Sequence, residues 1–205
     1  NRILYYRESN WWMYDPVKKT HTNLTEKVAT HWDNYNTSDA PHQFGAYGNP
    51  GWTNDGKNVL LYDANDIWLV AIDGSSSKRL TRGYEKNIVY RITPIEYDWR
   101  SQSNYDGRNP TIFDLSKDLL LEARNTDNWS TGYFIYNDKL KEHPLVYEAG
   151  KIDEIRKSKN SAYLFQTQTF NQSPRLEFRR KNQTASKILF QIGRASCRER
   201  VSSPV

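Results

Sequence analysis

An interval of twelve residues recurs along this sequence and restricts its fold more than any other feature. In the two clearest copies, a tryptophan is followed twelve positions later by a Leu-Thr pair. Four pairs of apolar residues share the interval: Trp12 and Leu24, Trp68 and Leu80, Phe134 and Val146, and Leu176 and Ile188. Self-similarity of this kind indicates an architecture that repeats one structural unit.

Each copy also contains the residues of a β-hairpin. Turn-forming residues lie inside each interval: Asp15-Pro16, Asp73-Gly74-Ser75, Asn137-Asp138 and Lys181-Asn182. An apolar run precedes each hairpin, at residues 3–6, 59–62, 119–121 and 162–165. Residues 151–156 alternate between apolar and polar and predict a further strand. The pattern predicts a four-stranded antiparallel sheet that recurs every 42 to 66 residues.

Recurring four-stranded sheets are typical of β-propeller blades, which bury both faces against their neighbours. We therefore expect an all-β fold, a partial β-propeller of about four four-stranded antiparallel blades over residues 1–191, with the innermost strand missing from the first blade. The irregular spacing predicts long loops at residues 26–50 and 97–110. A β-sandwich would also contain many short strands, but it does not readily explain the recurring interval.

The C-terminal residues call for a separate interpretation. Residues 192–201 resemble the translation of a common sequencing adapter, so we interpret residues 192–205 as an artefactual tail and expect the genuine chain to be interrupted near Gln191. The ten residues hold three arginines, one glutamate and the only cysteine, Cys197. Neither the net charge of +5 nor a thiol therefore supports a function. The first residues lack a signal-peptide pattern and resemble an internal start.

Composition excludes several classes of protein. Charged residues make up 26% and aromatic residues 14% of the sequence, which argues against a disordered chain. The longest apolar run, residues 67–72, is too short to span a bilayer. A single cysteine rules out an intramolecular disulfide and a Cys-rich zinc site. Basic residues cluster only at Arg179-Arg180-Lys181, which we expect to form a solvated strand and turn, so no nucleic-acid partner is expected.

Several motifs carry a resemblance to a known family: Ala46-Tyr47-Gly48, Gly51-Trp52-Thr53-Asn54-Asp55-Gly56-Lys57, Asp66-Ile67-Trp68, Asp73-Gly74, Arg79-Leu80-Thr81 and Tyr163-Leu164-Phe165. Together they resemble the propeller of bacterial prolyl oligopeptidase family serine peptidases, from about residue 3 to residue 191. The Asp-Gly-Lys and Leu-Thr motifs also occur in TolB-type propellers.

The resemblance implies one portion of a two-domain enzyme. In that family the propeller precedes an α/β-hydrolase domain that carries a Ser-Asp-His triad, and it restricts access to short or unstructured peptides. The resemblance also implies a periplasmic or secreted location and no cofactor. This sequence has no Gly-x-Ser-x-Gly nucleophile elbow, so no catalytic residue is carried over. We expect Gly74-Ser75-Ser76-Ser77 to form a hairpin turn rather than to supply a nucleophile.

Two groups of polar residues are candidates for binding. Some members of the family hold the free amino terminus of the substrate between paired propeller carboxylates. Glu85, Glu96 and Asp98 are the candidates here, although no family motif assigns them and solvated loop acids are the alternative. Residues 31–42 contain two histidines and two aspartates, but without a strong zinc spacing. We therefore expect a polar loop between blades there and no metal site.

The tryptophans fall into two groups. Trp12 and Trp68 occupy equivalent positions of the repeat, so we expect them to pack between blades. Trp32, Trp99 and Trp129 lie in predicted loops and are available for a peptide or a glycan. The main hypothesis is a non-catalytic propeller that gates and orients peptide substrates for an α/β-hydrolase domain. The alternative is a non-enzymatic TolB-like propeller that binds a protein or glycan partner.

Overall fold

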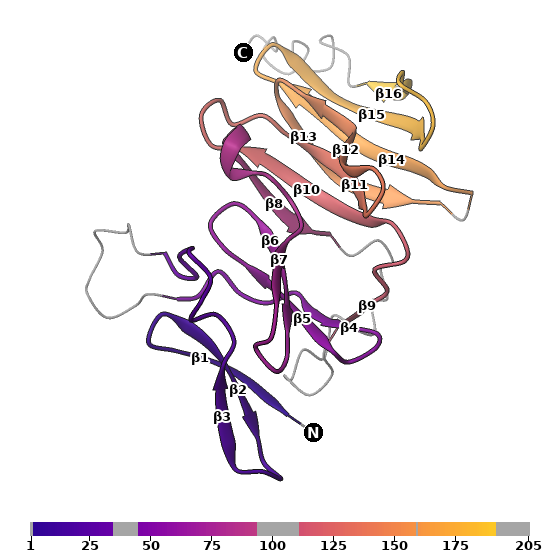
Figure 1. Ribbon diagram of the computed structural model, residues 1–205. Coiled ribbons are helices and arrows are strands. Elements are labelled where there is room, and N and C mark those ends of the chain that lie inside the picture. Colours follow the sequence, from indigo (N-terminus) through magenta and orange to yellow (C-terminus); the bar gives the residue numbers. More distant parts are fainter. Residues whose placement is uncertain (1, 35–44, 94–110, 159, 192–205) are drawn as a thin grey trace, which may run out of the picture.

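In the part of the chain that the structure describes, the regular elements are strands of antiparallel sheets, with one short 3₁₀ helix and one parallel strand pair (Figure 1). The computed structural model describes residues 2–34, 45–93, 111–158 and 160–191. No helix within these ranges has the length and apolar character needed to cross a membrane. The expectation of an all-β fold is confirmed.

Four sheets follow one another along the chain. Sheet I contains β1 (Ile3–Arg7), β2 (Asn10–Asp15) and β3 (Thr20–Asn23). Sheet II contains β4 (Gly51–Thr53), β5 (Asn58–Tyr62), β6 (Ile67–Ala71), β7 (Ser77–Arg79) and β9 (Ile112–Phe113). Sheet III contains β8 (Ile88–Ile92), β10 (Leu119–Asn125), β11 (Thr131–Asn137) and β12 (Lys141–Glu148). Sheet IV contains β13 (Lys151–Lys157), β14 (Ala162–Thr169), β15 (Gln172–Arg180) and β16 (Lys187–Gln191). The 3₁₀ helix η1 (Tyr84–Lys86) lies between β7 and β8.

These sheets have the form of propeller blades. Sheet I has three strands, and each of the others contains a meander of antiparallel strands. The four predicted apolar runs form β1, β5, β10 and β14, and the alternating segment at residues 151–156 lies in β13. The predicted loop at residues 97–110 lies outside the described residues, as do residues 35–44 of the loop at 26–50 and the whole tail 192–205.

The twelve-residue interval has the same structural meaning in the first two sheets. The Leu24 N–H donates to the Trp11 carbonyl at 2.8 Å, and the Leu80 N–H donates to the Ile67 carbonyl at 2.8 Å. In both hairpins, the leucine is thus the residue that closes the pairing of the last two strands.

The two weaker copies also form hairpins, and each has a shift in its strand pairing. In the third copy the shift does not change the interval: Val146 lies opposite Tyr133, the residue before Phe134, just as Leu24 pairs with Trp11 and Leu80 with Ile67. The pairing of β15 with β16 shifts next to Leu176, and Ile188 lies opposite Glu177. In this fourth copy the bulge displaces the interval without destroying the hairpin, because it inserts one residue in one strand.

Among the described residues the apolar core consists of three clusters, one between each pair of successive sheets. Representative residues are Trp11, Met13, Val59 and Leu61 between sheets I and II, Leu60, Ile67, Tyr90 and Leu121 between II and III, and Leu120, Ile135, Tyr163 and Phe165 between III and IV. Neighbouring residues such as Leu60 and Leu61 belong to different clusters because successive side chains of a strand point to opposite faces. A strand buried on both faces therefore has a continuous apolar run.

One strand returns to an earlier sheet. β9 follows β8 in sequence but pairs in parallel with β4, so that Trp52 lies opposite Ile112. Gly51 permits the approach, because a Cβ atom at that position would lie 2.2 Å from the Thr111 carbonyl oxygen. This parallel pair departs from the purely antiparallel blades that the sequence predicts.

Candidate functional site

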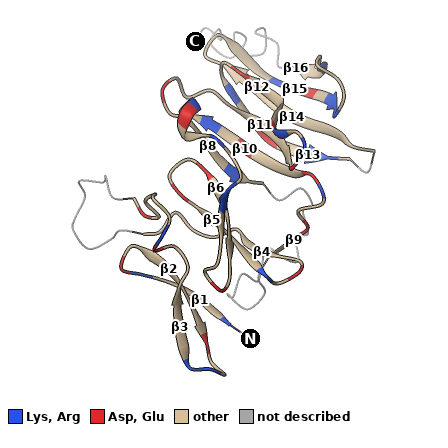
Figure 2. Cartoon of the chain, in the orientation of Figure 1, with Lys and Arg blue, Asp and Glu red and all other residues tan. Residues whose placement is uncertain are grey.

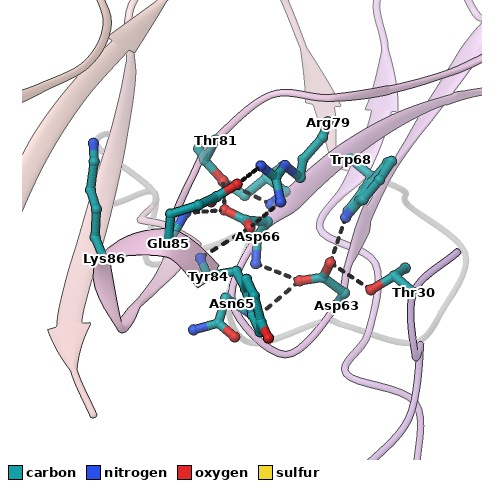
Figure 3. A network of polar contacts seen from close by, with 12 residues as sticks. Thr30, Asp63, Asn65, Asp66, Trp68, Arg79, Thr81, Tyr84, Glu85 and Lys86 are labelled. Carbon is teal, nitrogen blue, oxygen red and sulfur yellow. Dashed lines mark hydrogen bonds and ion pairs between the residues drawn. The ribbon is translucent and has the colours of Figure 1, made fainter. Parts of the chain in front are cut away.

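The turn between β5 and β6 holds two buried carboxylates and is the centre of the network in Figure 3. Asp66 is fully buried. Its Oδ1 accepts hydrogen bonds from the Thr81 hydroxyl, at 2.7 Å, and from the Gly83 N–H. Its Oδ2 accepts from the Tyr84 N–H at 3.3 Å and lies 3.6 Å from Arg79 Nη1. Burial nevertheless raises the pKa of Asp66, against the lowering effect of these hydrogen bonds.

Asp63 connects this turn to other parts of the fold. Its Oδ1 accepts from the backbone N–H groups of Asn65, at 2.9 Å, and Asp66. Its Oδ2 accepts from the Trp68 indole at 2.7 Å and from the Thr30 hydroxyl at 3.0 Å. Thr30 belongs to the segment that follows sheet I, so the carboxylate links that segment to sheet II (Figure 3).

Sheet III joins the same turn through Arg91 of β8. Arg91 Nη2 donates to the Asp63 carbonyl at 2.9 Å, and the guanidinium lies 4.6 Å from the centre of the Tyr62 ring. Burial lowers the pKa of Arg91. Because every oxygen of both carboxylates already faces a donor, the network is suited to joining sheets rather than to binding a ligand.

The first repeat contains a simpler form of the same arrangement. The Trp11 N–H donates to Thr25 Oγ1 at 3.0 Å, and the Thr25 hydroxyl donates to Asn10 Oδ1 at 2.9 Å. In the second repeat, Thr81 holds the Ile67 N–H in the same way, at 3.1 Å. In both repeats, the threonine of the Leu-Thr motif therefore connects the end of the hairpin to the start of its first strand, β2 or β6. The sequence pattern does not reveal this role.

The candidate carboxylate pair is only partly described. Glu85, in η1, forms an ion pair with Arg79 that lowers the Glu85 pKa, and half of its side chain is exposed. Glu96 and Asp98 lie outside the described residues. A paired carboxylate site for an amino terminus stays a prediction.

The segment at residues 31–42 is tied to sheet I at its start. Asp33 is 5% exposed, and its Oδ2 accepts from the Tyr6 hydroxyl at 2.7 Å and the Ser9 hydroxyl at 3.0 Å. His42 and Asp39 lie outside the described residues. Within the described ranges, no three histidine, cysteine, aspartate or glutamate side chains gather in a way that could hold a metal ion.

The prediction for Trp32 is wrong. Trp32 is 1% exposed and packs edge-on against Trp68 with ring centres 5.8 Å apart, because the segment after sheet I folds back into the cluster between sheets I and II. Trp68 contacts that cluster, as expected, whereas in the first repeat the buried member of the cluster is Trp11 and not Trp12. Trp129 is 67% exposed, with the Arg124 guanidinium 5.7 Å from its ring centre. Trp99 lies outside the described residues.

The basic cluster at residues 179–181 also differs from its prediction as a solvated segment. Arg180 is exposed, but Arg179 is 8% exposed because its side chain lies between β15 and β12. Lys181 forms an ion pair with Asp118. Basic and acidic residues are interspersed over the described sheets in Figure 2, and the absence of a nucleic-acid partner stays a prediction.

The serine-rich segment forms a hairpin turn, as predicted. Gly74 has a φ of +72°, which favours glycine, and the Ser75 N–H donates to Asp73 Oδ1 at 2.9 Å. Ser77 begins β7. A nucleophile elbow joins a strand to a helix, whereas this turn joins β6 to β7.

No protein family matches this sequence, and a search of curated proteins finds no significant match.

Proposed function

We propose that this chain is the non-catalytic propeller portion of a serine peptidase, which gates and orients peptide substrates for an α/β-hydrolase domain. The observation that carries the proposal is the succession of blade-like sheets, each packed against its neighbours through an apolar cluster. The motif resemblance to prolyl oligopeptidase family peptidases supports the choice of enzyme. A periplasmic or secreted location belongs to the same proposal.

The proposal assigns substrate access to the propeller and bond breaking to a separate hydrolase domain. In Figure 3 the Asp66 carboxylate is held by groups of sheet II and the segment after β7, and the Asp63 carboxylate links sheet II to the segment after sheet I; the serine-rich segment is a turn. The bond-breaking chemistry therefore belongs to the hydrolase domain. A rigid stack of sheets would limit which peptides reach that domain, since a folded substrate is bulkier than an extended one.

A TolB-like propeller that binds a protein or a glycan is the second candidate. The observation that favours it is Trp129, which presents an exposed ring on the loop between β10 and β11. An aromatic side chain on a rigid scaffold provides contact area at a low cost in conformational entropy.

Long-read sequencing of the source DNA through the codon for Gln191 tests both candidates. The peptidase proposal predicts that residues 192–201 are absent and that the frame continues into a segment with a Gly-x-Ser-x-Gly elbow. A gene that ends after further repeats would reject the enzyme and favour the binding protein. If residues 192–201 occur in genuine DNA, the adapter interpretation is wrong.

A fluorophosphonate probe, which labels active serine hydrolases, tests whether the propeller is non-catalytic. We expect no labelling of the purified 205-residue chain and labelling of the longer gene product, with a trypsin reaction as the positive control. Specific, denaturation-sensitive labelling of the 205-residue chain would show that the chain has a nucleophile of its own.

A further inference from the structure

A groove of about 510 Å³ lies between β12 of sheet III and the turn that joins β15 to β16 in sheet IV. Its apolar lining residues include Leu140, Leu145 and Val146, of which Leu145 and Val146 are buried. Glu148, Arg179 and Lys181 contribute charged groups. The volume falls within the range of roughly 300–1,000 Å³ that is usual for small-ligand sites.

Arg179 is a buried cation with two nitrogens hydrogen-bonded inside the protein and the third in a longer ion pair. Its Nη1 donates to the Leu145 carbonyl at 2.6 Å, and its Nε donates to the Ser186 hydroxyl at 2.9 Å. Its Nη2 lies 3.6 Å from a Glu148 oxygen, which is an ion-pair contact longer than a hydrogen bond. The two fixed nitrogens hold the guanidinium plane in place, so the third presents its N–H groups in a preorganised direction.

Of the charged groups in the groove, Arg179 is the one best placed to bind an anion. Lys181 is occupied by its ion pair with Asp118. Glu148 is 57% exposed on its side chain, so it is a weak, solvent-screened competitor for Nη2. A carboxylate brought in by a ligand would gain a charge-assisted hydrogen bond in a mostly desolvated place.

We propose that this groove binds the C-terminal carboxylate of a peptide that ends in an apolar residue. In such a residue the carboxylate and the apolar side chain are attached to the same Cα atom, which suits an arginine in a groove that apolar residues also line. The carboxylate accepts from Arg179 Nη2, and the side chain packs on the apolar lining, of which Leu140 is 55% exposed. This site goes beyond the proposed function and does not depend on a hydrolase domain.

Titration calorimetry with the purified chain tests the site. The probes are N-acetyl-Leu-Leu with a free carboxylate and the same dipeptide as its C-terminal amide. We expect the acid to bind at least about tenfold more tightly, the usual scale for a hydrogen bond to a charged group. A third probe, N-acetyl-Leu-Asp-Leu amide, carries its carboxylate on a side chain and should bind as poorly as the amide.

Three variants separate the site from its surroundings. Arg179→Gln should abolish the preference for the acid, whereas Arg180→Gln, which changes the exposed neighbour, should leave it unchanged. Glu148→Gln should tighten binding of the acid by a few fold, because it removes the competing carboxylate. Each variant is first checked by circular dichroism and thermal melting.

Two results would overturn the proposal. One is equal affinity for the acid and the amide. The other is a Glu148→Gln chain that binds the acid no more tightly than the parent chain. Both remain decisive if Arg179→Gln fails to fold. Equal affinity for the internal aspartate would reject the assignment to a C-terminus.

Discussion

At the scale of single residues, Asp66 shows how a charge can be kept inside this fold. Its carboxylate is fully buried, yet two backbone N–H groups, a hydroxyl and an arginine surround it. Asn10 occupies the equivalent place in the first repeat and accepts from a single hydroxyl there, that of Thr25. The second repeat therefore depends on its turn more strongly than the first.

We expect Asp66→Ala to lower the free energy of unfolding by about 2–4 kcal/mol, because the Thr81 hydroxyl and the Gly83 N–H lose their acceptor inside the protein. Urea denaturation at pH 7 measures the change. Asp127→Ala is the matched control: its carboxylate accepts from the exposed Asn87 amide, so a change within about 0.5 kcal/mol is expected. Equal effects of the two substitutions would contradict a special role for Asp66.

Carboxylates at turns contribute to the pH dependence of stability. Hydrogen bonds from Thr53, Ser75 and Ser116 lower the pKa values of the aspartates that accept them, Asp55, Asp73 and Asp114. A folded-state pKa below the unfolded value gives stability that is present above pH ~4 and is lost as the pH falls through the folded-state value. Asp66 has the opposite sign, because its raised pKa favours the folded state on acidification.

We therefore expect the urea midpoint to fall between pH 5 and pH 2, and to fall less in the triple variant Asp55→Asn, Asp73→Asn, Asp114→Asn. Asp66→Asn should do the reverse and steepen the loss, since it removes a group that stabilises the fold in acid. If the urea midpoint of the triple variant falls as steeply in acid as that of the parent chain, these turn carboxylates do not cause the loss of stability.

Single residues were the level at which the sequence was least informative. The burial of Trp32 depends on a segment that folds back over sheet II, and the burial of Arg179 depends on its neighbour β12, 34 positions away in the chain. Neither relation leaves a local pattern. The turn at Gly74, in contrast, was predictable because its chemistry is contained in neighbouring residues.

At the scale of elements, the strands were predictable because they are short apolar runs bounded by turn residues. The strand registers were less so. The bulges at Tyr133 and Leu176 shift the pairing by one residue, and the sequence alone does not indicate on which side of a hairpin the extra residue lies. The parallel pair of β4 and β9 was missed because two residues of strand give no periodic signal.

Gly132 of β11 tests how tightly the strands of sheet III pack. A Cβ atom there would lie 2.2 Å from the Val146 carbonyl oxygen and 2.8 Å from the Tyr147 Cα atom, so backbone would have to move. We expect Gly132→Ala to destabilise the chain by about 1–3 kcal/mol, measured by thermal melting. Gly45→Ala, where a Cβ atom meets nothing within 4 Å, is the control and should have little effect. Equal melting temperatures would show that β12 can shift freely.

At the scale of the whole molecule, stability depends on the contacts between one sheet and the next along the chain. Each apolar cluster joins only two successive sheets, so an interior sheet is held from both sides. The fold class was predictable from the repeat, while the order of strands within sheet II was not, because β9 reaches it from the far side of β8.

Hydrogen exchange should follow this arrangement. The amides of β16 belong to a strand whose five residues are all exposed, whereas Val59, Leu60 and Leu61 of β5 are fully buried. We expect the β16 amides to exchange much faster than those of β5, as resolved by mass spectrometry of peptic fragments. Comparable protection of the two strands would indicate that β16 is covered by another surface in solution.

The return of β9 has a consequence for cutting the chain in two. β8 belongs to the first half of the sequence but pairs with β10, and β9 belongs to the second half but pairs with β4. Fragments 1–93 and 111–191 would thus each donate a strand to a sheet of the other. Produced together, they should copurify through a tag on one fragment, and deletion of β9 should weaken that recovery. The segment between β8 and β9 is therefore a suitable place to divide the chain into a two-part reporter, whose halves would associate by exchanging one strand each.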